Sequence, residues 1–199
     1  KSYIIRETAR NSFKNYIEIN LKDDFDNEKK YDYIKDTESF YLQLSTDYGN
    51  YLGDITDTII FLDEIQTYPH LISLLKALKK DNKYRYIASG SLLGITLKHI
   101  FIPMGSVEEI KMFPLDFEEF LIAQGVQKET FDYLKKCFIN AETVKNNIHL
   151  SIFNYFKKYL ISGGLPDSVN AILKDNIYEV RQNQSSTYNF YKDDASKYD

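Results

Sequence analysis

The stretch "TIIFLDEIQTYP", residues 58–69, places two adjacent carboxylates directly after a run of four apolar residues. The run is rich in β-branched and aromatic side chains and too short for a helix, which is typical of a strand buried on both faces of a parallel sheet. Asp63 and Glu64 would then lie at the carboxyl end of that strand, the edge at which open α/β sheets bind ligands. A charged ligand or a metal ion explains paired carboxylates there more easily than packing does. The alternative is that the two acids begin a solvated turn before the next helix.

The composition is that of a globular protein with one substantial domain, or with a domain and a small appendage. The 199 residues carry a formal net charge of -4, which gives no global attraction to nucleic acid. The single cysteine, Cys137, excludes an intramolecular disulfide, and the three histidines (70, 99 and 149) are isolated from one another, so a zinc site has little support. No apolar run reaches the length of about 20 residues that crosses a bilayer, and no secretory signal is present. We therefore expect a cytoplasmic protein.

The pattern along the chain alternates between strand-like and helix-like segments. Strands are predicted over residues 15–21, 58–62, 84–89 and 107–113, and helices over residues 2–13, within 23–50, from 69 onward and from 116 onward. Strands that alternate with helices indicate βαβ units and a parallel sheet. We therefore expect an α/β core over residues 1–124, followed over residues 125–199 by a helical lid and the start of a C-terminal region.

A strand that ends in Asp-Glu, followed by a helix and then by a strand that ends in small hydroxyl residues, is the layout of a P-loop NTPase core. In that layout Asp63 orients a water on Mg²⁺, and Glu64 polarises the water that attacks the γ-phosphate of ATP. A hydroxyl at the end of the next strand can sense this phosphate, and the candidates are Ser91 and, less favoured, Ser89. The alternative is that "SGS" forms an ordinary turn.

Such a core also needs a Gly-rich loop that ends in Lys-Ser or Lys-Thr at the start of a helix, where backbone amides bind phosphates. No such loop lies inside the chain, but Lys1 and Ser2 open a predicted helix that is followed by a strand. They hold the position that the end of G-x-x-x-x-G-K-[ST] would take. We therefore expect that the chain begins inside its phosphate-binding motif and that the protein is longer than these residues.

Seven stretches follow one another in an order that is shared with a known family: "KSYIIRE", "NYIEINL", "IIFLDEIQ", "YIASGSLLG", "VEEIKMFPLDFEEFL", "ISGGLPDSV" and "YKDDASKYD". On these stretches the chain resembles the bacterial and archaeal AAA-type ATPases that carry a DUF4143 region behind the ATPase core. The stretches cover nearly the whole chain, and "MFPLDFEEFL" is the most distinctive of them.

This resemblance implies a parallel P-loop sheet of the AAA type flanked by helices, a helical lid after residue 115 and a further C-terminal domain beyond Asp199. It implies ATP and Mg²⁺ as ligands. It also implies the roles of the site residues: Lys1 and Ser2 on the phosphates, Ser2 and Asp63 on Mg²⁺, Glu64 as the catalytic base and Ser91 as the sensor.

The chain departs from the family pattern at one point that matters for turnover. Many members have Gly-Arg before the "PL" strand, where this chain has Gly105 and Ser106, so an arginine finger is absent there. The arginines of the chain are Arg6, Arg10, Arg85 and Arg181. Of these, Arg181 in the lid is a candidate trans or sensor arginine, and a surface or packing role explains it about equally well.

Two hypotheses of function follow. The leading one is an ATPase that uses MgATP binding and slow hydrolysis to switch a protein client or its own C-terminal domain, because arginine fingers are worth about 10³–10⁵ in turnover. The alternative is a nucleotide-gated or degenerate protein-interaction module without useful turnover. We expect the 199 residues alone to lack activity, because most of the phosphate loop lies outside them. A homo-oligomer is compatible with either hypothesis, and neither a membrane nor a nucleic-acid partner is indicated.

Overall fold

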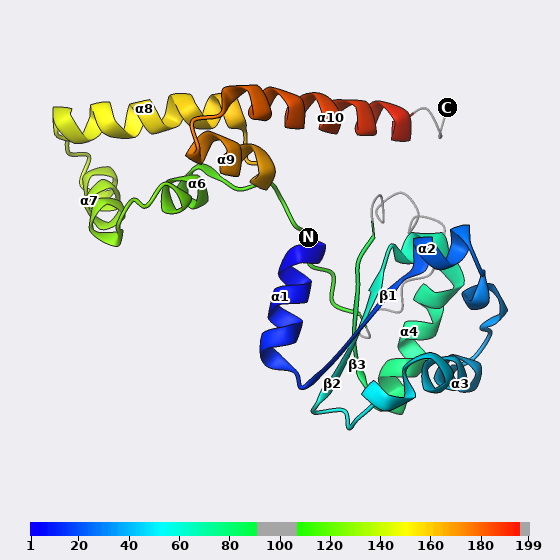
Figure 1. Cartoon of the computed structure of the whole chain (residues 1–199). Helices are drawn as coiled ribbons and strands as arrows, with labels where there is room; N and C mark the ends of the chain where they lie inside the picture. The colour runs from blue at the N-terminus through cyan, green and yellow to red at the C-terminus, as the bar shows by residue number, and fades with distance from the viewer. Residues whose placement is uncertain (91–106, 196–199) are drawn as a thin grey trace. The chain divides into compact units, whose positions relative to one another are not determined.

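The computed structural model describes residues 1–90 and 107–195, and the chain divides into two compact units, Lys1–Lys111 and Met112–Asp199 (Figure 1). The first unit contains a sheet and the second, over its described residues, is helical. The domain boundary near residue 124 remains a prediction.

The sheet of the first unit has three parallel strands in the order β1-β2-β3. The strands are β1 (Asn15–Asn20), β2 (Thr58–Asp63) and β3 (Arg85–Ala88). All six residues of β2 are buried, because β2 has a strand on each side and helices on both faces. The prediction of a buried parallel strand over residues 58–62 is therefore confirmed, and the strand extends one residue further, to Asp63.

Helices cover the two faces of this sheet. They are α1 (Ser2–Ser12), α2 (Leu21–Asp26), α3 (Thr37–Tyr48) and α4 (Pro69–Asp81), with short 3-10 turns at η1 (Lys30–Tyr33), η2 (Gly49–Tyr51) and η3 (Ile65–Thr67). Figure 1 shows α1 on one side of the sheet and α2, α3 and α4 on the other. The arrangement is a three-layer α/β fold, as expected for a P-loop NTPase.

The core of this unit lies between the sheet and the larger helical layer. The side chains at alternate strand positions point into it and pack on α3 and α4; the buried cluster includes Ile17, Ile19, Ile60, Leu62, Phe40, Leu44, Leu71 and Leu78. Because successive side chains of a strand point to opposite faces, Tyr16 and Glu18 lie on the α1 side of the sheet. The spacing of apolar residues in β1 thus decides which of its polar residues can reach α1.

The predicted strand over residues 107–113 is wrong. Residues 107–116 have no secondary structure, and the side chains of Ile110 and Phe113 are 79% and 80% exposed. Among the described residues the sheet has the order β1-β2-β3, and this segment pairs with neither of its two edge strands. A strand-like sequence without a partner for its backbone groups does not form a strand.

The second unit is built from five helices in its described residues: α6 (Phe117–Ala123), α7 (Lys128–Ile139), α8 (Asn146–Ser162), α9 (Pro166–Leu173) and α10 (Ile177–Ala195). Its core gathers apolar side chains from α6, α9 and α10, namely Phe120, Val169, Ala171, Ile172 and Val180. The helical pattern predicted from Asp116 onward is confirmed. Asp116 is the N-cap of α6 and forms a capping box with Glu119. Its carboxylate accepts from the Glu119 backbone N–H at 2.8 Å, and the Glu119 carboxylate accepts from the Asp116 backbone N–H at 2.9 Å.

One backbone contact joins two of the sequence stretches that are far apart in this unit. The Leu115 N–H donates to the Gly164 carbonyl at 2.8 Å, and the Tyr159 hydroxyl donates to the Leu115 carbonyl at 3.0 Å. A Cβ added to Gly164 would lie 2.0 Å from the Leu115 carbonyl oxygen, so only glycine permits this approach.

Over the described residues, no helix of either unit combines the length and the apolar character needed to cross a membrane.

Candidate functional site

Three polar side chains meet where the first unit's strands end. Asp63 is the last residue of β2, Ser89 directly follows β3, and Ser2 is the first residue of α1. The parallel register pairs Leu62 with Ala88, which brings the ends of β2 and β3 to the same edge of the sheet. The carboxyl edge is the expected place for a ligand in an open parallel sheet.

One oxygen of the Asp63 carboxylate accepts three hydrogen bonds, each from a different part of the fold. Its Oδ1 atom accepts from the Ser2 hydroxyl at 3.2 Å, from the Glu64 backbone N–H at 3.1 Å and from the Ser89 hydroxyl. Asp63 is only 6% exposed and Ser89 only 3%. The start of α1, the turn after β2 and the end of β3 are therefore tied together through a single buried carboxylate.

The turn after β2 holds Glu64 in a left-handed backbone conformation, with φ 57° and ψ 44°. The next residue, Ile65, is 1% exposed and donates its N–H to the Ser89 carbonyl at 3.0 Å, while the Ser89 N–H donates to Leu62 at 2.9 Å. A non-glycine residue in this region of the backbone costs energy, so the surrounding hydrogen bonds and packing hold Glu64 in this conformation. The Glu64 carboxylate accepts from the side-chain amide of Gln66.

A second ionic group lies beside Asp63 on the α1 side of the sheet. Arg6 makes three hydrogen bonds to Glu18, and the Tyr16 hydroxyl donates to the same carboxylate at 2.7 Å. These hydrogen bonds, led by those from Arg6, hold the pKa of Glu18 below its ordinary value. Burial, followed by the hydrogen bond to Glu18, raises the pKa of Tyr16. The Arg6 Nη2 atom also lies 3.9 Å from Oδ2 of Asp63.

Residues 1–121 match a family described as the AAA domain. The chain belongs to this family. No curated protein and no solved structure matches the chain. Because AAA domains are P-loop nucleotide-binding domains, the match agrees with the three-layer fold and with a ligand site at the carboxyl edge of the sheet.

The AAA domain places four of the predicted site residues, Lys1, Ser2, Asp63 and Glu64, at this edge. The Ser2 hydroxyl and the Glu64 backbone N–H both donate to Asp63, and the Lys1 ammonium donates to the Gly90 carbonyl at 2.6 Å, just past β3. The predicted sensor Ser91, like Gly105, Ser106 and His99, lies outside the described residues. The roles of all these residues on nucleotide remain predictions.

Sequence reasoning missed two parts of the AAA site. It did not predict the contact of Ser89 with Asp63, which follows from the parallel register of β2 and β3. It also gave Arg6 and Glu18 no role. Arg6 lies one helical turn after Ser2, on the same face of α1. Glu18 alternates with the buried residues Ile17 and Ile19, so its side chain points to the α1 side of the sheet. These two periodicities together could have predicted the contact between Arg6 and Glu18.

The residues present fit a magnesium ion that is bound together with a nucleotide. Mg²⁺ prefers oxygen ligands and in such sites takes one or two protein groups, with phosphates and waters completing its shell. The Ser2 hydroxyl and the Asp63 carboxylate, 3.2 Å apart, supply such oxygens. Within the residues that the structure describes, no cluster of three or more His, Cys, Asp or Glu side chains could hold a metal by itself. Any metal there would thus depend on the nucleotide for ligands.

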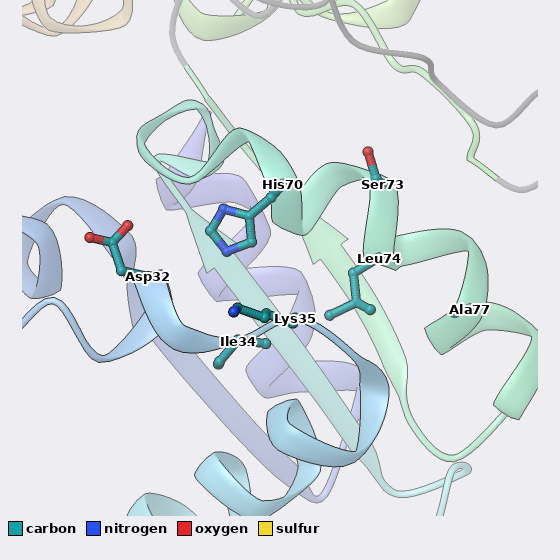
Figure 2. A pocket seen from close by; sticks show the side chains of 7 residues that line it. All are labelled: Asp32, Ile34, Lys35, His70, Ser73, Leu74 and Ala77. Atoms are coloured by element: carbon teal, nitrogen blue, oxygen red, sulfur yellow. The ribbon is translucent and has the colours of Figure 1, made fainter.

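The AAA domain also has a surface pocket of about 490 Å³ away from these carboxylates (Figure 2). It lies between α4 and the segment that includes η1, and its lining residues are Asp32, Ile34, Lys35, His70, Ser73, Leu74 and Ala77. The His70 Nε2 atom is 3.0 Å from the Tyr31 carbonyl oxygen, so this ring already has a backbone partner. None of the predicted site residues lines the pocket, and we assign it no role.

Proposed function

We propose that this protein binds MgATP at the carboxyl edge of its sheet and hydrolyses it as a molecular switch. The observation that carries the proposal is the Asp63–Glu64 pair at the end of a fully buried parallel strand, with the Ser2 hydroxyl on Asp63. The membership of the AAA domain family supports the nucleotide as the ligand. We further propose that a DUF4143-type region follows the ATPase core.

The side chains of this site divide the work between binding and proton transfer. Ser2 and Asp63 would hold Mg²⁺, which would neutralise phosphate charge when bound, and the Lys1 ammonium would bind phosphate oxygens. Glu64 would orient the attacking water and accept its proton as the water oxygen bonds to the γ-phosphorus and ADP leaves. The backbone position from which the Glu64 side chain projects is fixed by the left-handed turn, because the next residue, Ile65, is buried and hydrogen-bonded to Ser89.

The arginines of the chain favour slow turnover and therefore a switch. Arg6 is bonded to Glu18, and Arg10 and Arg85 each lie over an aromatic ring. Arg181 is exposed on α10, where it is the candidate to act in trans. An arginine finger is worth about 10³–10⁵ in turnover, so a site that waits for an arginine from a partner hydrolyses ATP slowly until that partner arrives.

The second unit suggests what a switch would act on. Its helices expose large apolar side chains, including Phe138 on α7 (88%), Leu160 on α8 (67%) and Phe190 on α10 (73%). Exposed apolar side chains that gather into a contiguous patch mark a surface that another chain or domain covers. They favour a protein client or the C-terminal domain as the regulated partner, and they would serve equally in a nucleotide-gated module without turnover.

Glu64→Gln in the full-length protein distinguishes these functions. The substitution keeps the size and the hydrogen-bonding oxygen of the side chain but removes the base, so ATP binding should persist while turnover falls by at least a hundredfold. Phosphate release and calorimetric ATP binding with Mg²⁺ measure the two effects. Glu7→Gln, on the exposed face of α1, is the matched control and should leave both unchanged.

Each of the other outcomes points elsewhere. Binding with equally negligible turnover in the unaltered and Glu64→Gln proteins would indicate the nucleotide-gated module. No binding of ATP by the unaltered protein would overturn the nucleotide proposal and leave a protein-interaction scaffold.

A further inference from the structure

The guanidinium of Arg6 lies between two carboxylates and bonds to only one of them. Its Nε atom donates to Glu18 Oε1 at 2.9 Å and Oε2 at 3.0 Å, and its Nη2 atom donates to Oε1 at 2.6 Å. The same Nη2 atom is 3.9 Å from Oδ2 of Asp63, beyond hydrogen-bond length. This contact is a long ion pair, and an approach closer by about 1 Å would turn it into a hydrogen-bonded ion pair with Asp63.

Glu18 is itself held by a second donor besides Arg6. The Tyr16 hydroxyl donates to its Oε2 atom at 2.7 Å, and the two residues share the α1 face of β1 because they are two positions apart. Glu18 and Arg6 have 22% and 40% of their side chains exposed, so the pair is partly shielded from water. The position of the guanidinium is thus set by a carboxylate that is held in place by the strand.

The two oxygens of Asp63 have different surroundings. Oδ1 accepts hydrogen bonds from Ser2, Glu64 and Ser89, whereas the ion-pair contact of Oδ2 is with Arg6 at 3.9 Å. A hydrogen bond from Arg6 to Oδ2 would bring the positive charge closer to the carboxylate that a bound Mg²⁺ must share. Two cations beside one carboxylate repel each other, so such a hydrogen bond would weaken the binding of the metal.

We propose that Glu18 is a positioning residue of the magnesium site, which acts by holding Arg6 away from Asp63. This inference rests on the proposed function, because it concerns the Mg²⁺ that would bind with ATP. Arg6 in its observed position links α1 to β1 while leaving Asp63 available to the metal. Loss of the Glu18 charge would release Arg6 towards Asp63.

The test is the Mg²⁺ concentration that half-saturates ATP binding, measured by calorimetry on the full-length protein. Glu18→Gln keeps the shape of the side chain but removes the charge that holds Arg6, and should raise this concentration about fivefold, a change worth about 1 kcal/mol. The double variant Arg6→Gln/Glu18→Gln removes the released cation as well, and should return it to within about twofold of the unaltered protein.

The rescue separates positioning from a merely structural role. If the ion pair only held α1 to the sheet, the double variant would be at least as impaired as Glu18→Gln, because neither restores the pair. Glu7→Gln removes an exposed charge of α1 and should change nothing. Thermal unfolding followed by circular dichroism shows that each variant is folded.

The outcomes also distinguish this inference from the proposed function. Unchanged Mg²⁺ dependence in Glu18→Gln, or no recovery in the double variant, would overturn the role of Glu18 while MgATP binding by the unaltered protein stands. Failure of the unaltered protein to bind ATP with Mg²⁺ would overturn the proposed function and this inference with it.

Discussion

Replacement of Gly164 by alanine should loosen the second unit strongly, because the added carbon has no room. The new Cβ would lie 2.0 Å from the Leu115 carbonyl oxygen and 2.8 Å from the Leu115 nitrogen. A carbon and an oxygen in contact are about 3.3–3.6 Å apart, so the two backbones must separate by about 1.3 Å or more. The clash is with backbone on both sides, so no side-chain rotation relieves it.

The magnitude follows from the two contributions. Overpacking of this kind costs about 1–3 kcal/mol, and separation of the backbones breaks the 2.8 Å hydrogen bond from Leu115 to Gly164, which contributes about 0.5–1.5 kcal/mol. We therefore expect the free energy of unfolding of this unit to fall by about 2–4 kcal/mol. The Tyr159 hydroxyl, which donates to the Leu115 carbonyl, would be displaced along with it.

Native-state hydrogen exchange measures the loss of stability within the second unit itself. The amide of Val169 in α9 donates to Leu165 at 2.9 Å and reports on the opening of the second unit. Gly49→Ala is the matched control, because nothing lies within 4 Å of its added Cβ and its backbone is helical, so it should be neutral or stabilise by about 0.4–1 kcal/mol. A free energy of exchange in Gly164→Ala within about 0.5 kcal/mol of the unaltered protein would refute the reasoning, since ordinary surface substitutions have effects of that size.

Two further predictions concern the carboxylates on the sheet. The folded-state pKa of Glu18 lies below its unfolded value of about 4.3, so its stabilising contribution is complete above that pH and is lost as the pH falls through the folded pKa. Urea unfolding between pH 6 and pH 3 should therefore show a steeper loss of stability in the unaltered protein than in Glu18→Gln, and parallel slopes would contradict this. Ser89→Ala removes a buried donor to the Asp63 carboxylate, and since hydrogen bonds to charged groups contribute about 1.5–3 kcal/mol, urea unfolding should show a loss in this range, whereas an unchanged midpoint would mean that the bond contributes nothing.

Strands β1 and β2 could be predicted from sequence, because the pattern of their apolar side chains reflects which faces of each strand are buried. The apolar run before Asp63 is continuous because β2 has neighbours on both sides and both faces, and the alternation of Ile17 and Ile19 with polar residues marks the two faces of β1. The Asp63–Glu64 pair at the strand end then placed the site at the carboxyl edge. The family followed from motifs rather than from periodicity.

The errors and omissions have a different cause. Residues 107–113 carry a strand-like pattern, but a strand also depends on a neighbour for its backbone, and the local sequence does not contain that information. The contacts of Arg6 with Glu18 and of Ser89 with Asp63 likewise depend on the register between separate elements. Polar pairs of this kind become visible only after the strands have been aligned.

The convergence of three donors on one oxygen of Asp63 makes this corner of the molecule act as a single unit. Ser2, Glu64 and Ser89 belong to different elements, yet each competes for space and charge around the same atom. A shift of α1 that moves Ser2 would also change the hydrogen bond between Asp63 and Ser89 at the end of β3, even if α1 and β3 do not touch. The effects of substitutions at Ser2 and Ser89 on stability should therefore not be additive, because the carboxylate redistributes its bonds whenever one donor is altered.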